Sequence, residues 1–470
     1  MIVEAHGCAR EYRIASFTYS TFVDGNELVQ RQTAPASNFL RSAIPSSLYR
    51  SAFAPPLLIG IAFFYLAYAS HAPPVSVWSL FLPLAAAWLG FAWFAALSPG
   101  RVALVAGILC AVAVRIAGIW SLPIHEDDWA RYLWDGIRFL QDGTPYKYAP
   151  AAYFDFDLGP PWDSVLAQVN NPSVPTIYAP TLQYVFALAT WIGPASLTTL
   201  KAILVTFDVL LWGVIARLGG AVAGLRYALC PLVIFEVAFN AHADIVGVAL
   251  IMVCYALALS GRWVHAGLAI GLAIASKPFA LIVAPTLLRG RWIVTGVAAL
   301  AALIALYAPF VLSGATELEG LQVFSRWWEF NSFGFVGLKA LLGDPTARTA
   351  SFIVGSGLAA ALALRWRFAE PNTVPPADIW LLALLVFAPV INPWYLLWAL
   401  PWACLRPNAL TWAVLPAISL SYLTTGVLGL EADSFHDHPV WVRPLEVAVG
   451  GAIYAVLTHV MRHREAVGAD

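Results

Sequence analysis

Residues 102–128 read VALVAGILCAVAVRIAGIWSLPIHEDD, and this stretch joins the two features that decide the fold. Residues 102–122 are apolar apart from one charge, Arg115, and a membrane-spanning helix needs about 20 such residues. The segment from His125 to Asp128 then ends the apolar pattern with three consecutive acids. The stretch therefore predicts a spanning helix that delivers an acidic segment to the membrane surface.

The composition of the whole chain agrees with a membrane protein. Of its 470 residues, 60% are hydrophobic and only 11% are charged, whereas soluble domains carry roughly 25% charged residues. Lipid as the surrounding solvent removes the need for a polar surface. The net charge of -1 provides no basic patch for nucleic acid, so we expect a lipid bilayer, and no nucleic acid, around the protein.

Thirteen apolar runs predict an all-α polytopic membrane domain over residues 51–465, with about 11–13 transmembrane helices plus re-entrant or interfacial helices. The runs are 54–72, 75–97, 102–122, 181–194, 198–217, 225–240, 243–261, 264–288, 292–312, 350–366, 377–405, 408–427 and 440–461. Residues 1–50 are mixed polar sequence without a long apolar run, which predicts a cytoplasmic tail. Residues 123–180 hold eight acids and form the first large loop.

Three of these runs are predicted to be irregular. Ser276-Lys277-Pro278 and Asn392-Pro393-Trp394 each divide a run into two half-length helices, because proline interrupts a helix. The run 181–194 is short for a crossing, so we expect it to be re-entrant or interfacial.

Arginines at the ends of the runs predict the orientation, because cytoplasmic loops are enriched in Lys and Arg. One consistent solution places the arginine-bearing ends inside. It leaves the following segments outside: 123–180, 241–244, 277, 313–335, 392 and 428–439. If the run 181–194 crosses instead, Arg217 moves outside. We therefore predict a multi-pass protein of the inner (plasma) membrane, with its acidic first loop on the extracytoplasmic side.

The sequence after the acids predicts an amphipathic helix that lies in the membrane interface. Its apolar face holds residues at helical spacing: Trp129, Leu133, Ile137 and Leu140. Its polar face alternates in charge, which predicts a ladder of surface ion pairs: Asp128, Arg131, Asp135, Arg138 and Asp142.

The acids that open this helix allow two interpretations. Asp127 or Asp128 could cap the helix N-terminus. Alternatively, one of the three acids is a general base at the boundary between water and lipid, where like-charge repulsion raises carboxyl pKa values and makes a carboxylate more basic. From the residues alone, both interpretations stay open.

Several motifs of the chain resemble the GT-C superfamily of membrane glycosyltransferases, and the polyprenyl-phosphomannose-dependent bacterial mannosyltransferases in particular. The first loop carries Asp127-Asp128, the run RYLWDG at 131–136 and the run GTPYKYAP at 143–150. Further segments agree in order: Thr176 to Pro180, with Ala179 in place of a proline; Glu236 to Asp244, with departures at Ala241 and Ala243; Ser276-Lys277-Pro278; and Asn392 to Trp398. The resemblance covers about residues 100–430.

This resemblance implies transfer of a sugar, mannose in the closest relatives, from a polyprenyl phosphate to a hydroxyl of a glycan or glycolipid, with inversion at the anomeric carbon. A first-loop acid is the implied base, so the catalytic candidates are Asp127, Asp128 and Glu126. Candidate cations for the donor phosphate are Lys277, which lies in an apolar run where charge is costly, then Arg326 and Arg131. Arg115 is another cation, but it could instead pair with a membrane acid such as Asp208.

The other matching motifs supply candidate substrate-binding residues, namely Tyr178, Glu236, His242, Asp244, Asn392, Trp394 and Tyr395. His242 and Asp244 could also suggest a metal, but side chains two positions apart face opposite sides of a helix. The five cysteines, Cys8, Cys110, Cys230, Cys254 and Cys404, show no paired spacing. We therefore expect no metal site and no cofactor, and a divalent cation is unsupported.

A transporter or flippase of lipid-linked saccharides is the alternative from another functional class. In that case Lys277, Glu236 and Asp208 would line a pathway through the membrane. The concentration of acids in one loop, rather than along the spans, favours the enzyme.

Overall fold

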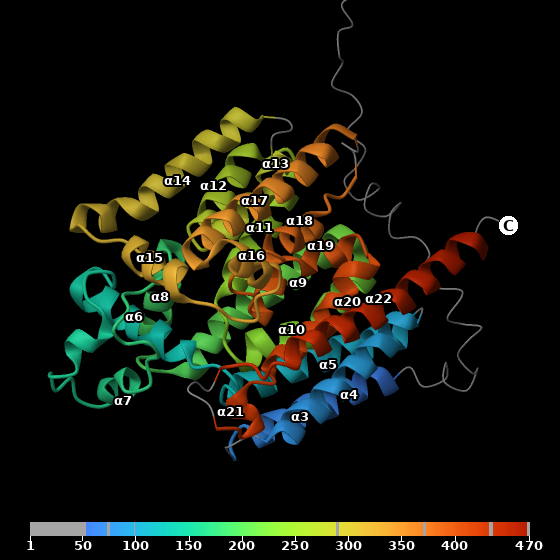
Figure 1. The fold of residues 1–470 in the computed structure, drawn as a ribbon, viewed down its shortest axis with the longest axis horizontal. Coiled ribbons are helices and arrows are strands. Elements are labelled where there is room, and N and C mark those ends of the chain that lie inside the picture. Colours follow the sequence, from blue (N-terminus) through green and yellow to red (C-terminus); the bar gives the residue numbers. More distant parts are fainter. Residues whose placement is uncertain are drawn as a thin grey trace, which may run out of the picture.

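The computed structural model describes residues 53–72, 76–97, 99–287, 291–369, 373–431 and 436–467, and this part of the chain is an all-α polytopic membrane protein (Figure 1). The predicted tail 1–50 lies outside the described residues. Six helices are long and apolar enough to cross a membrane. They are α4 (Val77–Ala96), α5 (Arg101–Trp120), α9 (Leu197–Ala228), α14 (Trp292–Ser313), α17 (Asp344–Ala369) and α22 (Val442–Val467).

The other predicted runs correspond to shorter helices. Apolar helices of 10–17 residues are α3 (Ala54–Ala69), α11 (Asp244–Leu259), α12 (Trp263–Ile274) and the continuous stretch Ala409–Tyr422, which combines α20 (Ala409–Ala417) with η6 (Ile418–Tyr422). The run 225–240 becomes the end of α9, α10 (Pro231–Val233) and the π-helix η3 (Ile234–Phe239).

Both predicted breaks are present. Lys277 has extended backbone (φ -162°, ψ 136°) between α12 and the 3-10 helix η4 (Pro278–Val283). Asn392 is likewise extended (φ -77°, ψ 147°) before the 3-10 helix η5 (Pro393–Trp398), which follows α18 (Ala377–Leu385) and precedes α19 (Leu400–Leu405). Each of these residues precedes a proline, which disfavours helical backbone at that position.

The run 181–194 folds as α8 (Pro180–Ile192), whose 13 residues span only about 20 Å. It packs against α6 (Asp128–Asp142), the helix that follows the acids. Gly136 permits this contact, because a Cβ at that position would overlap Thr190 and the carbonyl of Phe186. Helix α6 is thus fixed to the bundle by close backbone packing.

Segments predicted to share one side of the membrane gather at one end of the bundle. The ring of His125 lies 5.9 Å from that of His436, and the ring of Phe330 lies 4.7 Å from that of His438. In Figure 1, α6, α15 (Leu318–Trp327) and α7 (Trp162–Leu166) lie toward one end of the molecule, whereas the C-terminus lies at the other. The 26 residues of α22 span about 39 Å and lead to the C-terminus (Figure 1).

A buried ionic network lies between α5 and α9. Arg115 Nε donates to Asp208 Oδ2 at 2.6 Å, and Arg115 Nη1 donates to the Ala228 carbonyl at 2.8 Å. The Tyr227 hydroxyl donates to Asp208 Oδ1 at 2.7 Å. The pairing of Arg115 with Asp208 is therefore confirmed, and this arginine is committed to the interior of the bundle.

Candidate functional site

The acidic segment begins where α5 ends. Lys201, a fully buried residue of α9, donates from Nζ to the carbonyl oxygens of Gly118 (3.0 Å) and Ser121 (2.7 Å), and to Ser121 Oγ (3.2 Å). These acceptors belong to the last turn of α5 and its C-terminal cap, where the Gly118 carbonyl also accepts from the Ser121 hydroxyl at 2.7 Å. Lys201 therefore fixes the end of α5, from which the chain reaches the acids.

Asp127 and Asp128 share one hydrogen-bond donor. Asn170 Nδ2 donates to Asp127 Oδ1 at 2.6 Å and to Asp128 Oδ1 at 3.0 Å. Asp127 occupies the N-cap position of α6, but its side chain makes no capping hydrogen bond, and Asp128 is already the first helical residue. The helix-cap interpretation is therefore wrong for the Asp127 side chain, and both carboxylates are tied to a loop instead.

Glu126 and His125 lie deeper in the same segment. His125 Nδ1 is 3.2 Å from Glu126 Oε1, and 11% of the Glu126 side chain is exposed. Burial raises the pKa of the Glu126 carboxyl well above its usual range. His242 acts in the opposite direction, and neighbouring carboxylates, Asp128 first among them, raise the pKa further. Burial lowers the pKa of His125 to about 4, so this histidine is neutral at pH 7 and adds no positive charge to the segment.

Asp127 also has a raised pKa. Burial is the main cause, and the charge of Asp128 adds to it, while the hydrogen bond from Asn170 acts in the opposite direction. A carboxylate with a raised pKa is a stronger base near neutral pH. The segment therefore provides carboxyl groups whose basicity exceeds that of an ordinary surface acid.

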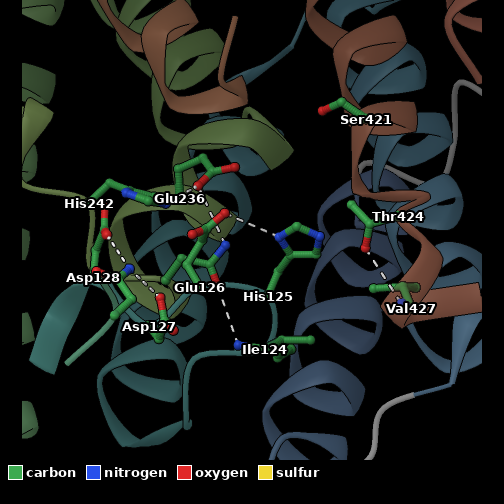
Figure 2. Close-up of polar contacts among 12 residues, drawn as sticks. Ile124, His125, Glu126, Asp127, Asp128, Glu236, His242, Ser421, Thr424 and Val427 are labelled. Carbon is green, nitrogen blue, oxygen red and sulfur yellow. Dashed lines mark hydrogen bonds and ion pairs between the residues drawn. The ribbon is translucent and has the colours of Figure 1, made fainter. Parts of the chain in front are cut away.

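His242 and Glu236 form a fully buried pair next to the acidic segment (Figure 2). His242 Nε2 is 3.0 Å from Glu236 Oε2, both side chains are fully buried, and Asn240 Nδ2 donates to the same Glu236 oxygen at 3.4 Å. The His242 ring stacks on Trp394 with centroids 3.8 Å apart. Figure 2 shows Glu236 and His242 grouped with the four residues from His125 to Asp128, so the structure brings these sequence-predicted residues together.

A second pair provides a cation near Asp128. Lys277 Nζ lies 2.7 Å from Asp244 Oδ1, which also accepts a hydrogen bond from Trp398 Nε1 at 2.7 Å. The Lys277 ammonium is 4.0 Å from the ring centroid of Tyr395, whose hydroxyl hydrogen-bonds with Asn392.

Tyr132 connects this second pair to the acids. Burial raises the pKa of Tyr132, and the charges of Asp128 and Asp244 raise it further. The Tyr132 hydroxyl is 3.5 Å from Asp128 Oδ2, and its ring meets that of Tyr178 edge to face at 4.9 Å. Tyr178 therefore lies beside the acidic segment, as its assignment to the site requires.

The predicted charge ladder on α6 is largely wrong. Arg131 is buried and donates to the carbonyl oxygens of Val174 (3.0 and 2.9 Å) and Asn171 (3.2 Å), so its Nη atoms bind this loop and form no ion pair along the helix. Asp135 is buried as well. The loop after α7 covers this face of α6, and only the exposed end keeps an ion pair, between Arg138 and Asp142 at 3.3 Å.

Asp135 attaches α6 to the segment that leads into α8. It accepts hydrogen bonds from Thr176 Oγ1 and from Gln183 Nε2, the latter at 3.1 Å. Burial raises the pKa of Asp135 to about 6.

The structure does not place Arg326 with the other candidates. It is exposed on α15, where its guanidinium lies 5.2 Å from the Trp327 ring centroid. Among the described residues, its hydrogen bonds and ion pairs do not include the acidic segment. Lys277 is therefore the one predicted phosphate-binding residue that stands beside the acids.

An apolar cavity of about 410 Å³ lies between α18, α20 and α22. Its walls include Leu382, Val386, Val414 and Val447. At its polar end, Asn331 Nδ2 donates to Glu446 at 3.0 Å. Phe330, next to Asn331 in the sequence, contacts His438, and His436 contacts His125 of the acidic segment. These two ring contacts connect the polar end of the cavity with the acids.

Comparison with known proteins gives no match to a family model and no significant match to a curated protein. Within the described ranges, no three His, Cys, Asp or Glu side chains are arranged as metal ligands.

Proposed function

We propose that this protein is a multi-pass inner-membrane glycosyltransferase that acts on the extracytoplasmic face. It transfers a sugar, with mannose as the first candidate, from a polyprenyl-phosphate donor to a hydroxyl of a glycan or glycolipid. The observation that carries the proposal is the group of three adjacent carboxylates beside the Lys277–Asp244 pair, at the end of a spanning helix.

Asp128 is the first choice for the base, and Asp127 and Glu126 are the alternatives. Its carboxylate removes the proton from the acceptor hydroxyl while that oxygen attacks the anomeric carbon. The bond from this carbon to the phosphate oxygen breaks, and its electron pair leaves with the polyprenyl phosphate. One displacement inverts the anomeric centre, and one carboxylate is enough because a phosphate leaves without being protonated.

Lys277 is the cation that this step requires. Charge grows on the phosphate as the bond breaks, and a fixed positive group is most valuable where charge develops. The ammonium carries three donor hydrogens, and the contact with Asp244 occupies one of them. The remaining donors are free to bind phosphate oxygens, and Tyr395 below the ammonium fixes its position.

The apolar cavity matches the remainder of the donor. A polyprenyl chain is a long hydrocarbon, and apolar walls between α18, α20 and α22 would bury part of it. This feature supports a lipid-linked sugar over a soluble nucleotide sugar.

The test is release of polyprenyl phosphate from labelled polyprenyl-phosphomannose by native membranes that contain the overproduced protein. Asp128→Asn should lower this release about 10²–10⁴-fold, the usual contribution of a general base, without changing the amount of folded protein. The matched control is Asp155→Asn, an exposed acid of the same loop, which should leave the rate unchanged. Equal rates for both variants would remove Asp128 from the mechanism, and Asp127→Asn and Glu126→Gln would then be compared.

The same preparation decides between an enzyme and a transporter. If the purified protein releases no polyprenyl phosphate but moves lipid-linked mannose across the bilayer of liposomes, the enzyme proposal is wrong. Release of polyprenyl phosphate that depends on Asp128 would contradict the transporter.

A further inference from the structure

The side chain of Asn170 connects two parts of the chain that are 42 residues apart. Its Nδ2 atom lies between the two aspartates, at 2.6 Å from Asp127 Oδ1 and 3.0 Å from Asp128 Oδ1. An amide nitrogen carries two hydrogens, so Asn170 can give one to each carboxylate. No motif of the sequence singles this residue out.

We propose that Asn170 is a positioning residue that holds the carboxylates of Asp127 and Asp128 in fixed orientations toward the acceptor by donating one amide hydrogen to each. The inference rests on the proposed function, because it assigns Asn170 a task in presenting the base. Asn170 touches neither donor nor acceptor in this role and acts through the aspartates.

Two adjacent carboxylates repel each other, and repulsion favours turning them apart or protonating one. A donor shared by both offsets this repulsion and ties down one oxygen of each group. The hydrogen bond from Asn170 lowers the pKa of Asp127, against the effects of burial and of Asp128. Asn170 thereby favours the ionised form, which is the form able to accept a proton.

The loop that carries Asn170 is itself fixed to α6. Val169, its neighbour, is buried in the core. Arg131 donates to the carbonyl oxygens of Asn171 and Val174, and this arginine lies one turn after Asp127 and Asp128 on the same helix. Asp127, Asp128 and Asn170 are therefore all attached to helix α6. A catalytic group is oriented precisely when such a rigid element holds it.

Other charged or titratable groups also face Asp127, so the pH response is not that of an isolated acid. They are Asp128 and Glu126 from its own segment, His125, and His436 from the segment before α22. Burial lowers the pKa of His436 as well as that of His125. At neutral pH these two histidines therefore carry little charge. Asp128 also faces His242 and the Tyr132 hydroxyl, whereas Asn170 donates hydrogen bonds to both aspartates.

The experiment compares Asn170→Leu with Gln168→Leu. Gln168 is a matched control, because it lies two residues away and is exposed, and its amide side chain hydrogen-bonds to the Ser164 carbonyl and not to the aspartates. In the polyprenyl-phosphomannose assay, Asn170→Leu should lower kcat about 10- to 100-fold with KM changed less than about threefold. The acidic limb of its pH–rate profile should move to higher pH, because the ionised form has lost its donor.

A second readout does not require catalysis. The Tm of each purified variant is measured between pH 5 and pH 8. A folded-state pKa raised above the unfolded value gives stability that is present at low pH and is lost as pH rises through the folded pKa. Asn170→Leu raises this pKa further, so its Tm should fall more steeply with pH than that of the wild type or of Gln168→Leu.

The outcomes separate this inference from the proposed function. A steeper Tm profile in a protein without transferase activity would support the pairing and refute the function. Transferase activity with neither a changed pH–rate limb nor a changed Tm profile would refute the role of Asn170. If Asn170→Leu does not yield folded protein, Asn170→Ser is smaller and polar, and the same two readouts decide.

Discussion

Two parts of this protein hold charged side chains out of water in opposite ways. Between α5 and α9, one arginine faces one aspartate, and carbonyl oxygens and the Tyr227 hydroxyl satisfy the remaining contacts. At the end of α5, three acids stand together, and the nearest histidine, His125, is neutral at pH 7. In the first cluster one cation matches one anion, whereas in the second the carboxyl groups outnumber the two bases beside them, Lys277 and His242.

This difference separates a structural role from a functional one. Removing one partner from a balanced buried pair is costly, but the intact pair needs nothing from outside. An unbalanced group of carboxylates destabilises the unliganded protein, and natural proteins accept such a cost mainly at functional sites. The contrast predicts that substitutions in the first cluster reduce stability, whereas substitutions in the second reduce activity.

Among substitutions in the balanced cluster, we expect Arg115→Met to reduce stability the most. It leaves Asp208 buried without its ion-pair partner, so the free energy of unfolding should fall by about 3–5 kcal/mol. Thermal or denaturant unfolding in detergent measures this loss. The double variant Arg115→Met/Asp208→Leu should recover part of it, because the unpaired charge is then removed. A loss below about 1 kcal/mol in the single variant would argue against a structural role for the pair.

Substitution of Lys277 tests the second cluster by removing the cation that is paired with Asp244. Lys277→Gln should lower kcat/KM for polyprenyl-phosphomannose about 100-fold, the scale associated with one group that stabilises developing negative charge. Lys147→Gln is the control, because Lys147 is an exposed lysine of the first loop, 5.5 Å from the Tyr148 ring centroid. Equal effects of the two substitutions would assign Lys277 to packing with Asp244 and Tyr395 alone.

The pH dependence of transfer should reflect the raised carboxyl pKa values. A base works only when it is ionised, so the rate should fall as pH falls through the pKa of the base. Burial and repulsion raise the pKa values of Glu126 and Asp127, so an acidic limb above the usual carboxyl range of about 4 is expected where either of these two acids is the base. A rate that stays constant down to pH 4 would contradict Glu126 and Asp127 as the base.

Glu126→Gln should give the smallest effect, and one of opposite sign. The folded-state pKa of Glu126 lies above its unfolded value, so this carboxyl makes the folded state less stable as pH rises toward neutrality. The glutamine variant should therefore be more stable than the wild type at pH 7, by about 0.5–2 kcal/mol, and this gain should shrink at pH 4. Unfolding curves at the two pH values measure the difference.

The sequence predicted the parts of this fold that depend on local physics. Apolar length located the spanning helices, and the prolines after Lys277 and Asn392 located both interruptions. His125, Phe330 and His436 lie at one end of the bundle. This agrees with the arginine pattern, which predicts the side of the membrane for each loop without any knowledge of packing.

Long-range packing explains what the sequence did not predict. Periodicity identified α6, but it assigned Arg131 and Asp135 to a surface ladder, because it could not show that the loop carrying Asn170 covers that face. Asn170 lies in irregular chain after a short helix, without a motif. Lys201 is an isolated charge in an apolar run, and the cost of such a charge was the one available signal that it has a partner.

The contact of Lys201 with the end of α5 has an electrostatic consequence for the acids. The aligned peptide units of a helix leave about half a negative charge at its C-terminus, and the C-terminus of α5 points toward the segment that contains Glu126. The amine of Lys201 places its N–H bonds on these last carbonyls. Lys201 thereby offsets the negative end of the α5 dipole next to the carboxylates. A substitution of Lys201 in α9 would therefore change the electric field at the acidic segment without touching it.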